Sequence, residues 1–248
     1  MDENIFNVFN LMIYNAEGAK LVAVINVDTS FGADAIVARQ EIKSIWELKG
    51  KKIGVQKKTY SEHILDIVLK KNGLSPNDVI KIDFLEEKVA DAFINGTFDA
   101  IITWEPFVTE AIEKGNGRKL FDTSEIPGIC PALSVFHSKF VQERPGDVLA
   151  FVNVWHKTTL YIKEHPEDAF KIIADIYSVS IDEVKSFTTV DKILDLQANK
   201  IAFTYASGFD SLYGISLTVN KFMIDKGMIE KKMDSSEFFN GYFIRRIK

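Results

Sequence analysis

The sequence has 248 residues and a formal net charge of −5, with 46% hydrophobic and 26% charged residues. This length accommodates two small domains with their own hydrophobic cores, and the composition is that of an ordinary soluble globular protein. The weakly acidic balance argues against nucleic acid as a main partner, because phosphate binding requires a concentrated basic face.

Other residue counts argue against several further classes of protein. The single cysteine, Cys130, rules out an internal disulfide and argues against a multi-cysteine zinc site. The four histidines stand far apart without the spacing of a zinc motif, so we expect no metal and no cofactor. No apolar stretch is long enough to span a membrane, and residues 1–10 lack the pattern of a signal peptide.

The first part of the chain alternates strand and helix patterns. Ser61 begins the clearest helix, whose apolar residues share one face and which ends at Gly73. The alternation is typical of right-handed βαβ units and predicts an α/β domain with a mostly parallel sheet at about residues 45–135. Strands are expected at 21–25, 35–38, 52–56, 80–85 and 98–103, and helices at 61–73 and 87–95.

The pattern changes after residue 137 to longer helices, each with Pro, Asp or Ser near its first turn. They are expected at 146–164, 166–177 and 180–188, with a last helix at 213–226. Internal repeats and low-complexity tracts are absent from the sequence.

Three polar loops occupy positions suited to a binding site. In open α/β sheets, ligands bind beyond the carboxyl ends of strands, where helix N-termini present free N–H groups. The loops at 29–34, 57–61 and 103–107 each adjoin a predicted strand end. Their joint position at one sheet edge predicts a binding site more strongly than any one of them does.

Each of these residues also has a purely structural interpretation. In this interpretation Ser61 serves only as a helix cap, and Asp34 only as an Asx turn. Trp104 suits a packing role as well as a ligand platform. The pair Glu86 and Glu87 is interpreted as a solvated face at a helix start, where the helix dipole favours acidic side chains.

Catalytic motifs are absent from the sequence. It contains no GxSxG, GxGxxG or GxxxxGK[ST] pattern, and no histidine is near Cys130 in sequence. The run "GNGRK" at 115–119 is interpreted as a turn, because a phosphate cradle would require a preceding strand and a following helix.

A family resemblance rests on the run from "DTSFGADAIVAR" through "ELKGKKIGV" and "NGL" to "FDAIITWEPF". In order and spacing it resembles the substrate-binding proteins of ABC importers for nitrate, sulfonates, taurine and thiamine-precursor pyrimidines. The resemblance implies a type II periplasmic-binding-protein fold of class α/β, with two lobes, mostly parallel central sheets and a hinge. Lobe I would comprise 1–40 and 138–248, and lobe II 41–137.

The same resemblance implies a set of ligand-binding residues in the cleft between the lobes. The "SxGAD" loop supplies four residues, the loop before the helix at 61–73 three, and the "WEP" turn two. They are Ser30, Gly32, Ala33, Asp34, Thr59, Tyr60, Ser61, Trp104 and Glu105. Family members begin with about two further βα units that this sequence lacks, so lobe I is expected to be missing its N-terminal part.

The resemblance therefore implies a non-enzymatic receptor that delivers a small polar solute to ABC permease subunits. The receptor would be periplasmic or a lipid-anchored extracellular protein, and a monomer. Because Asp34 and Glu105 make the expected cleft acidic, an amine or aminopyrimidine is favoured over a bare anion such as nitrate. The alternatives are a ligand-sensing module of a signalling protein and a thiamine-pyrimidine synthase, although the lone Cys130 argues against the enzyme.

Overall fold

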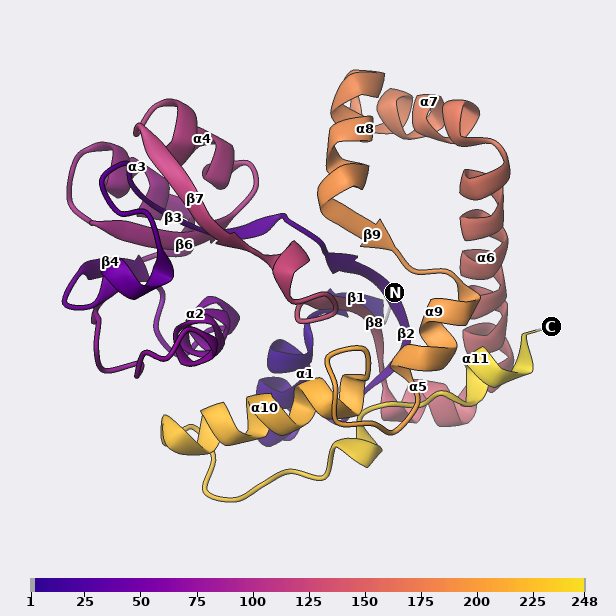
Figure 1. The fold of residues 1–248 in the computed structure, drawn as a ribbon. Coiled ribbons are helices and arrows are strands. Elements are labelled where there is room, and N and C mark those ends of the chain that lie inside the picture. The colour runs from indigo at the N-terminus through magenta and orange to yellow at the C-terminus, as the bar shows by residue number, and fades with distance from the viewer. Residues whose placement is uncertain (1–2, 248) are drawn as a thin grey trace. The chain divides into compact units, whose positions relative to one another are not determined.

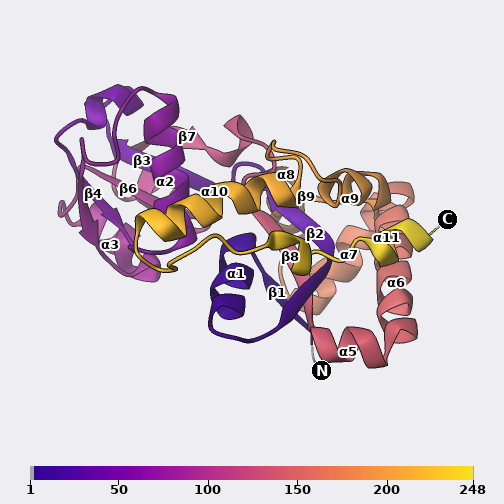
Figure 2. The ribbon, with the colours of Figure 1, turned by 90° about the horizontal axis from the view of Figure 1, so that it is seen from below.

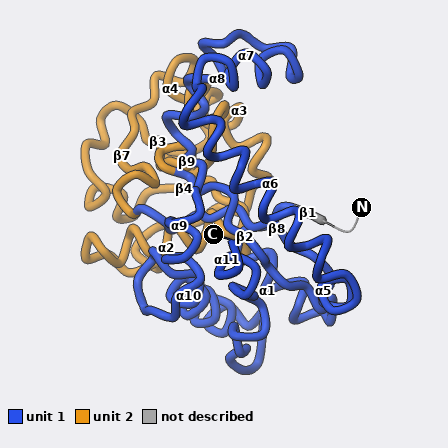
Figure 3. The backbone as a smooth tube through the Cα atoms, turned by 90° about the vertical axis from the view of Figure 1, so that its right-hand side faces the viewer, with its two compact units in different colours: residues 1–30, 127–248 blue, residues 31–126 orange. Residues whose placement is uncertain are grey.

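The computed structural model describes residues 3–247 and divides into two compact units. Unit 1 holds the residues up to 30 and from 127 onward, and unit 2 holds residues 31–126 (Figure 3). The chain passes from one unit to the other after residues 30 and 126, whereas the expected lobes change after residues 40 and 137. The reason is that the strand at 34–39 pairs within unit 2 and the strand at 131–137 pairs within unit 1. Among residues 3–247, none of the helices is both long and apolar enough to cross a membrane.

Unit 2 is built on a five-stranded sheet with the order β5-β4-β6-β3-β7 (Figure 1). Strands β4, β5 and β6 are parallel, whereas β3 runs antiparallel to both β6 and β7. The strands are β3 (Asp34–Arg39), β4 (Lys52–Val55), β5 (Ile80–Asp83), β6 (Ala100–Trp104) and β7 (Gly117–Asp122). The helices are α2 (Tyr60–Lys71), α3 (Val89–Ile94) and α4 (Phe107–Glu113), with short 3₁₀ turns η1 (Ile45–Leu48), η2 (Glu86–Lys88) and η3 (Thr123–Glu125).

The helices of unit 2 cover both faces of its sheet. Figure 1 shows α2 on the opposite side of the sheet from α3 and α4. The face toward α3 and α4 is a continuous apolar cluster that includes Val37, Phe93 and Ile101. Gly54 on β4 permits this packing, because a Cβ atom there would lie 2.6 Å from the Phe98 ring.

A buried ion cluster fastens α2 to the edge strand β5. The Lys81 ammonium lies 3.0 Å from the Glu62 carboxylate and also pairs with the Asp66 carboxylate. Glu62 and Asp66 are one helical turn apart on α2, and the Lys81 side chain is only 9% exposed. Carboxylates buried this deeply require a partner charge, so Lys81 is a structural residue of unit 2.

Unit 1 is built on a four-stranded sheet with the order β1-β8-β2-β9, in which every neighbouring pair is antiparallel. The expectation of mostly parallel sheets is thus met only in part: two of the four strand pairings in unit 2 are parallel, and those of unit 1 are antiparallel. The strands are β1 (Glu3–Phe6), β2 (Leu21–Ser30), β8 (Pro131–His137) and β9 (Asp191–Ile193). The helices are α1 (Val8–Ala16), α5 (Ser138–Glu143), α6 (Pro145–Glu164), α7 (Pro166–Tyr177), α8 (Ile181–Val190), α9 (Leu196–Ala202), α10 (Leu212–Asp225) and α11 (Tyr242–Arg246), with a 3₁₀ turn η4 (Ser235–Glu237).

Residues far apart in sequence join in the core of unit 1. Helices α1 and α10 pack together, with the rings of Phe9 and Phe222 5.8 Å apart (Figure 2). The fully buried Asn199 of α9 accepts from the Asn26 backbone N–H and donates to its carbonyl, both at 2.8 Å. This side chain satisfies both backbone groups of β2 at a point where the pairing of β2 with β8 is irregular.

Two carboxyl groups lie close together where β2 pairs with β9. Asp28 is opposite Ile193, and Asp191 is opposite Ser30. Burial, with a smaller contribution from the Asp191 charge, raises the pKa of Asp28 to about 6. Burial also raises the pKa of Asp191. The ionised form of Asp28 therefore destabilises folded unit 1.

We predict that Lys81→Met destabilises unit 2 by about 3–5 kcal/mol, because the substitution removes the cation from two buried carboxylates. Urea denaturation monitored by circular dichroism measures this change. The control is Lys49→Met, since Lys49 is 60% exposed and its contact with Asp78 is 3.5 Å long. The exposed pair should contribute less than about 1 kcal/mol. Equal losses in the two variants would contradict a structural role for Lys81.

We predict that Asp28→Asn stabilises the protein at pH 7.5 by up to about 3 kcal/mol. Because the folded-state pKa lies above the unfolded value, the folded state binds more protons between about pH 4 and pH 6. Native stability in the wild type is therefore lost as the pH rises through this window, and the difference from the variant should vanish below pH 4. Urea titrations at pH 3.5 and 7.5 measure the effect, with exposed Asp175→Asn as the control. A variant no more stable than wild type at pH 7.5 would refute the effect.

Candidate functional site

The three predicted loops adjoin one edge of the unit 2 sheet. Strands β4 and β6 are parallel and end at this edge, while antiparallel β3 begins there. Asp34 lies directly opposite Trp104, and the Glu105 N–H donates to the Ala33 carbonyl at 2.9 Å. Residues 33–34 and 104–105, some seventy positions apart in sequence, are therefore neighbours in the fold.

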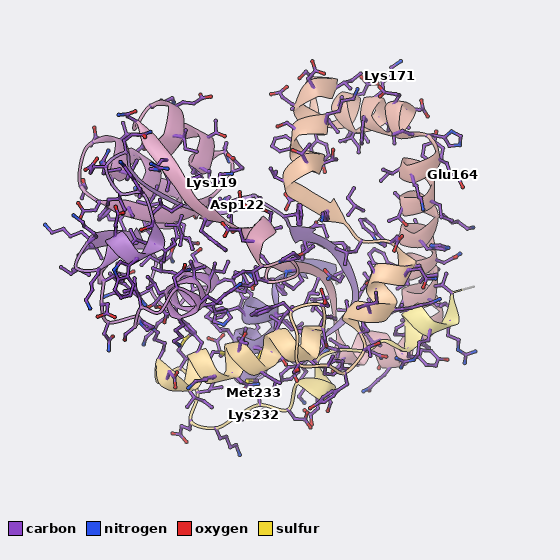
Figure 4. All side chains as sticks on the ribbon, in the orientation of Figure 1. Lys119, Asp122, Glu164, Lys171, Lys232 and Met233 are labelled. Carbon is purple, nitrogen blue, oxygen red and sulfur yellow. The ribbon has the colours of Figure 1, made fainter. Side chains whose placement is uncertain are left out.

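The glycine loop between β2 and β3 is held by side chains of unit 2. Gly32 has a φ of +125°, a conformation that favours glycine, and its N–H donates to the Thr123 hydroxyl at 2.8 Å. Thr123 follows Asp122, whose carboxylate caps η3 and lies 3.1 Å from the Lys119 ammonium (Figure 4). Ser30 is the last residue of β2 and belongs to unit 1, where its N–H donates to the Cys130 carbonyl at 2.9 Å.

Acidic side chains of the protein itself hold the loop that precedes α2. The N–H of Lys57 donates to Asp83 at 2.9 Å, and the N–H of Lys58 donates to Glu62 at 2.8 Å. Thr59 is the N-cap residue, and its hydroxyl donates to the Gln56 carbonyl at 2.7 Å. Ser61, expected as the cap, instead lies within the first turn of α2.

Glu86 is the residue of this edge that the sequence interpretation placed wrongly. It is half-buried at the start of η2, whereas Glu87 beside it is exposed. Its carboxylate lies 3.3 Å from the Thr59 hydroxyl, which shares its single proton between this carboxylate and the nearer Gln56 carbonyl. The carboxylate also accepts from the Ser61 hydroxyl, and the Glu86 N–H donates to the Gln56 side-chain oxygen at 3.3 Å. Burial raises the pKa of Glu86, and the two hydroxyl hydrogen bonds oppose that rise.

The aromatic residues of the edge differ in exposure. Tyr60 is only 6% exposed, with its ring 5.8 Å from the His63 ring, so little of its ring surface is available to a ligand. Trp104 is half-buried and meets Phe107 edge-on at 6.0 Å. Trp104 is therefore the better platform for a planar group.

Glu105 is also engaged within unit 2. Its carboxylate accepts from the Thr109 N–H at 3.0 Å and so caps the first turn of α4. The residue thus lies at the predicted edge but has a structural role that the sequence interpretation did not assign to it.

The loops at this edge carry hydroxyls, an amide, carboxylates and one half-buried indole. These groups suit reversible binding of a small polar molecule by hydrogen bonds and stacking. Across residues 3–247, no group of three or more His, Cys, Asp and Glu side chains is placed to hold a metal ion.

Sequence relatives share most of this chain. A protein of Bacillus subtilis named for binding aliphatic sulfonates is 28% identical over 216 residues, which cover 86% of this chain and 62% of that protein. The chain therefore spans less than two thirds of the length of this relative. A protein of Haemophilus influenzae named for thiamine biosynthesis is 24% identical over 228 residues, covering 90% of this chain and 69% of that one.

A solved structure shares the fold. The crystal structure of the periplasmic aliphatic sulphonate binding protein SsuA from Escherichia coli matches with a TM-score of 0.75 at 18% identity, covering 96% of this chain and 74% of that one. The chain thus has the α/β fold of a periplasmic binding protein, as the motifs predicted. The family model described as NMT1/THI5 like matches residues 5–169, about two thirds of the sequence. The chain belongs to the NMT1/THI5-like family.

Proposed function

We propose that this protein is a solute-binding receptor of an ABC importer, and that the edge of unit 2 contacts the solute. Its family membership and its likeness to sulfonate-binding proteins favour reversible binding. The observation that carries the assignment to this edge is the adjacency of Asp34 and Trp104 across β3 and β6, beside the start of α2.

Each residue of the edge receives a proposed role. Trp104 stacks on a planar or apolar part of the solute. Asp34 and the hydroxyls of Thr59 and Ser61 form hydrogen bonds with its polar groups, and Gly32 and Ala33 keep the backbone close to it. Tyr60 supports the start of α2 from within the core, and Glu105 positions the turn before α4.

The receptor proposal includes partners, location and the fate of the solute. The permease subunits of the importer receive the solute, and the protein works outside the cytoplasm as a periplasmic or lipid-anchored monomer. Binding without chemistry is supported by the names of the relatives, most of which are binding proteins. A solute recovered unchanged by mass spectrometry after incubation would support this; a new product would indicate an enzyme.

We predict that Trp104→Ala weakens solute binding at least tenfold, because it removes the exposed indole surface of the edge. The measurement is a thermal-shift screen of sulfonates, amines and aminopyrimidines, followed by calorimetry on the compounds that bind. A ligand at 100 times its dissociation constant stabilises by about 2.7 kcal/mol, which raises the midpoint of a protein of this size by roughly 5–10 °C.

Trp46→Ala is the matched control, since Trp46 lies on η1 and is 57% exposed. It should bind solute as the wild type does. Equal losses of affinity in both variants would move the site away from Trp104. A wild-type protein that binds none of the screened compounds would contradict the receptor proposal itself.

A further inference from the structure

An open cavity lies in unit 1, at the end of its sheet where β2 begins. Its volume is about 690 Å³, and it is lined by the turn between α1 and β2, by the first residue of α5 and by the segment from residue 231 to η4. The chain leaves unit 1 at the other end of β2, after Ser30. All the lining residues belong to unit 1, so the cavity is distinct from the edge of unit 2 that we propose for the solute.

Lys20 lines this cavity in a strained backbone conformation. Its φ is +55°, in the left-handed region that lysine rarely adopts and glycine adopts freely. The Ser138 N–H donates to the Lys20 carbonyl at 2.8 Å. The Asn15 side chain accepts from the Leu21 N–H at 2.7 Å and donates to the Leu21 carbonyl at 2.9 Å. These contacts hold the turn in a conformation that costs stability, and what a lysine adds there over a glycine is an ammonium group beside the cavity.

Two further lysines line the cavity from a second segment. Lys231 and Lys232 belong to the irregular segment between α10 and η4, on which Figure 4 labels Lys232 and Met233. The Asn220 side chain of α10, only 2% exposed, accepts from the Met233 N–H at 2.8 Å and donates to the Met233 carbonyl at 3.2 Å. This buried amide fixes the backbone of the segment to α10, so the two lysines are placed at the cavity before any ligand binds.

The charges around the cavity are unbalanced. Across residues 3–247, none of these three lysines forms an ion pair with a carboxylate. Of the two acidic residues in the lining, Asp234 is engaged, because its carboxylate accepts from the Ser236 N–H at 2.9 Å and caps η4. Hydrogen bonds from Ser236 are the main causes of a lowered pKa of Asp234, and the Lys232 charge is the smallest. Glu237 is thus the one remaining carboxylate of the lining against three ammonium groups, in a chain whose net charge is −5.

Lysines around a cavity of this size suit an organic phosphate. A phosphate monoester carries a charge of about −1.5 to −2 at pH 7 and three strong acceptor oxygens, and lysine ammonium groups bind phosphate as point charges. The Ser138 hydroxyl lines the same cavity and can donate a further hydrogen bond. Leu21, Val22 and Phe238 supply apolar lining, and the volume exceeds that of a phosphate group, so there is room for an organic part.

We propose that this cavity binds a phosphate monoester through the ammonium groups of Lys20, Lys231 and Lys232, as a second ligand site of the protein. Two sources share this chemistry, a free phosphate ester in solution and the headgroup of phosphatidic acid in a membrane. The site lies in unit 1 and makes no use of the solute edge, so the receptor proposal does not depend on it.

The experiment uses glycerol 3-phosphate as the soluble probe, measured by calorimetry at pH 7.5 and low ionic strength, with glycerol as the uncharged comparison. Co-sedimentation with phosphatidylcholine vesicles, with and without phosphatidic acid, tests the membrane source. We expect glycerol 3-phosphate to bind and glycerol not to bind. Binding only to the vesicles that contain phosphatidic acid would also support the site and would assign the lipid headgroup. Binding to neither probe would overturn the proposal and leave the receptor proposal intact.

Lys20→Gly separates binding from folding at this site. Because glycine adopts a positive φ freely, the variant should be at least as stable as the wild type in urea denaturation and yet bind the phosphate probe about tenfold more weakly. Lys139→Gln is the matched control, since Lys139 follows Ser138 in α5, has a side chain that is 73% exposed and does not line the cavity. It should bind the probe as the wild type does. Equal losses in the two variants would show a diffuse charge effect and refute the site.

Two further variants test the sign of the charge effect on the second segment. Lys231→Gln combined with Lys232→Gln should weaken binding by about tenfold or more, because two charged donors are lost. Glu237→Gln should tighten binding, because it removes the remaining carboxylate of the lining. A phosphate probe whose affinity is the same in the double variant and the wild type would bind elsewhere, and that result would overturn the assignment to this cavity.

Discussion

The buried ammonium of Lys81 is the charge on which the edge of unit 2 depends. It pairs with both Glu62 and Asp66, two carboxylates that are buried in α2. Glu62 in turn accepts from the backbone N–H of Lys58, a residue with a φ of +58°. The strained loop before α2 is thus connected through Glu62 to the Lys81 ammonium on β5. The position of the proposed site therefore depends on an ion cluster within the protein and not on a ligand.

Other acidic side chains also fix the loop before α2. The N–H groups of Lys57 and Lys58, which precede the N-cap Thr59, donate to Asp83 and Glu62, and the Glu86 carboxylate lies 3.3 Å from the Thr59 hydroxyl. These internal hydrogen bonds stabilise the loop in the absence of solute. A preformed loop lowers the entropic cost of binding, because fewer side chains need to be ordered when the solute arrives.

Much of this architecture could be predicted from local sequence patterns. The apolar periodicity and Gly73 define α2 to within a residue or two, and the long helices from 145 to 190 follow from their Pro and Ser starts. Strand β1 and helix α1 were not predicted, because "ENIF" is short and "VFNLMIYNA" is apolar on most sides. The antiparallel pairing of unit 1 was also missed, since register depends on partners such as Asn199 and Asn26, which are 173 positions apart.

Glu86 shows why the chemistry of a site is harder to predict than its place. From the sequence alone it is one of two acidic residues after a strand, and the dipole argument assigns both to a solvated face. In the fold, β5 lies beside β4, so the turn after β5 meets the loop after β4 and brings Glu86 to Thr59. Family membership fixes the backbone that makes this meeting possible. The side chains at this meeting point differ between sequences, so proteins that share one fold can differ in the solutes they bind.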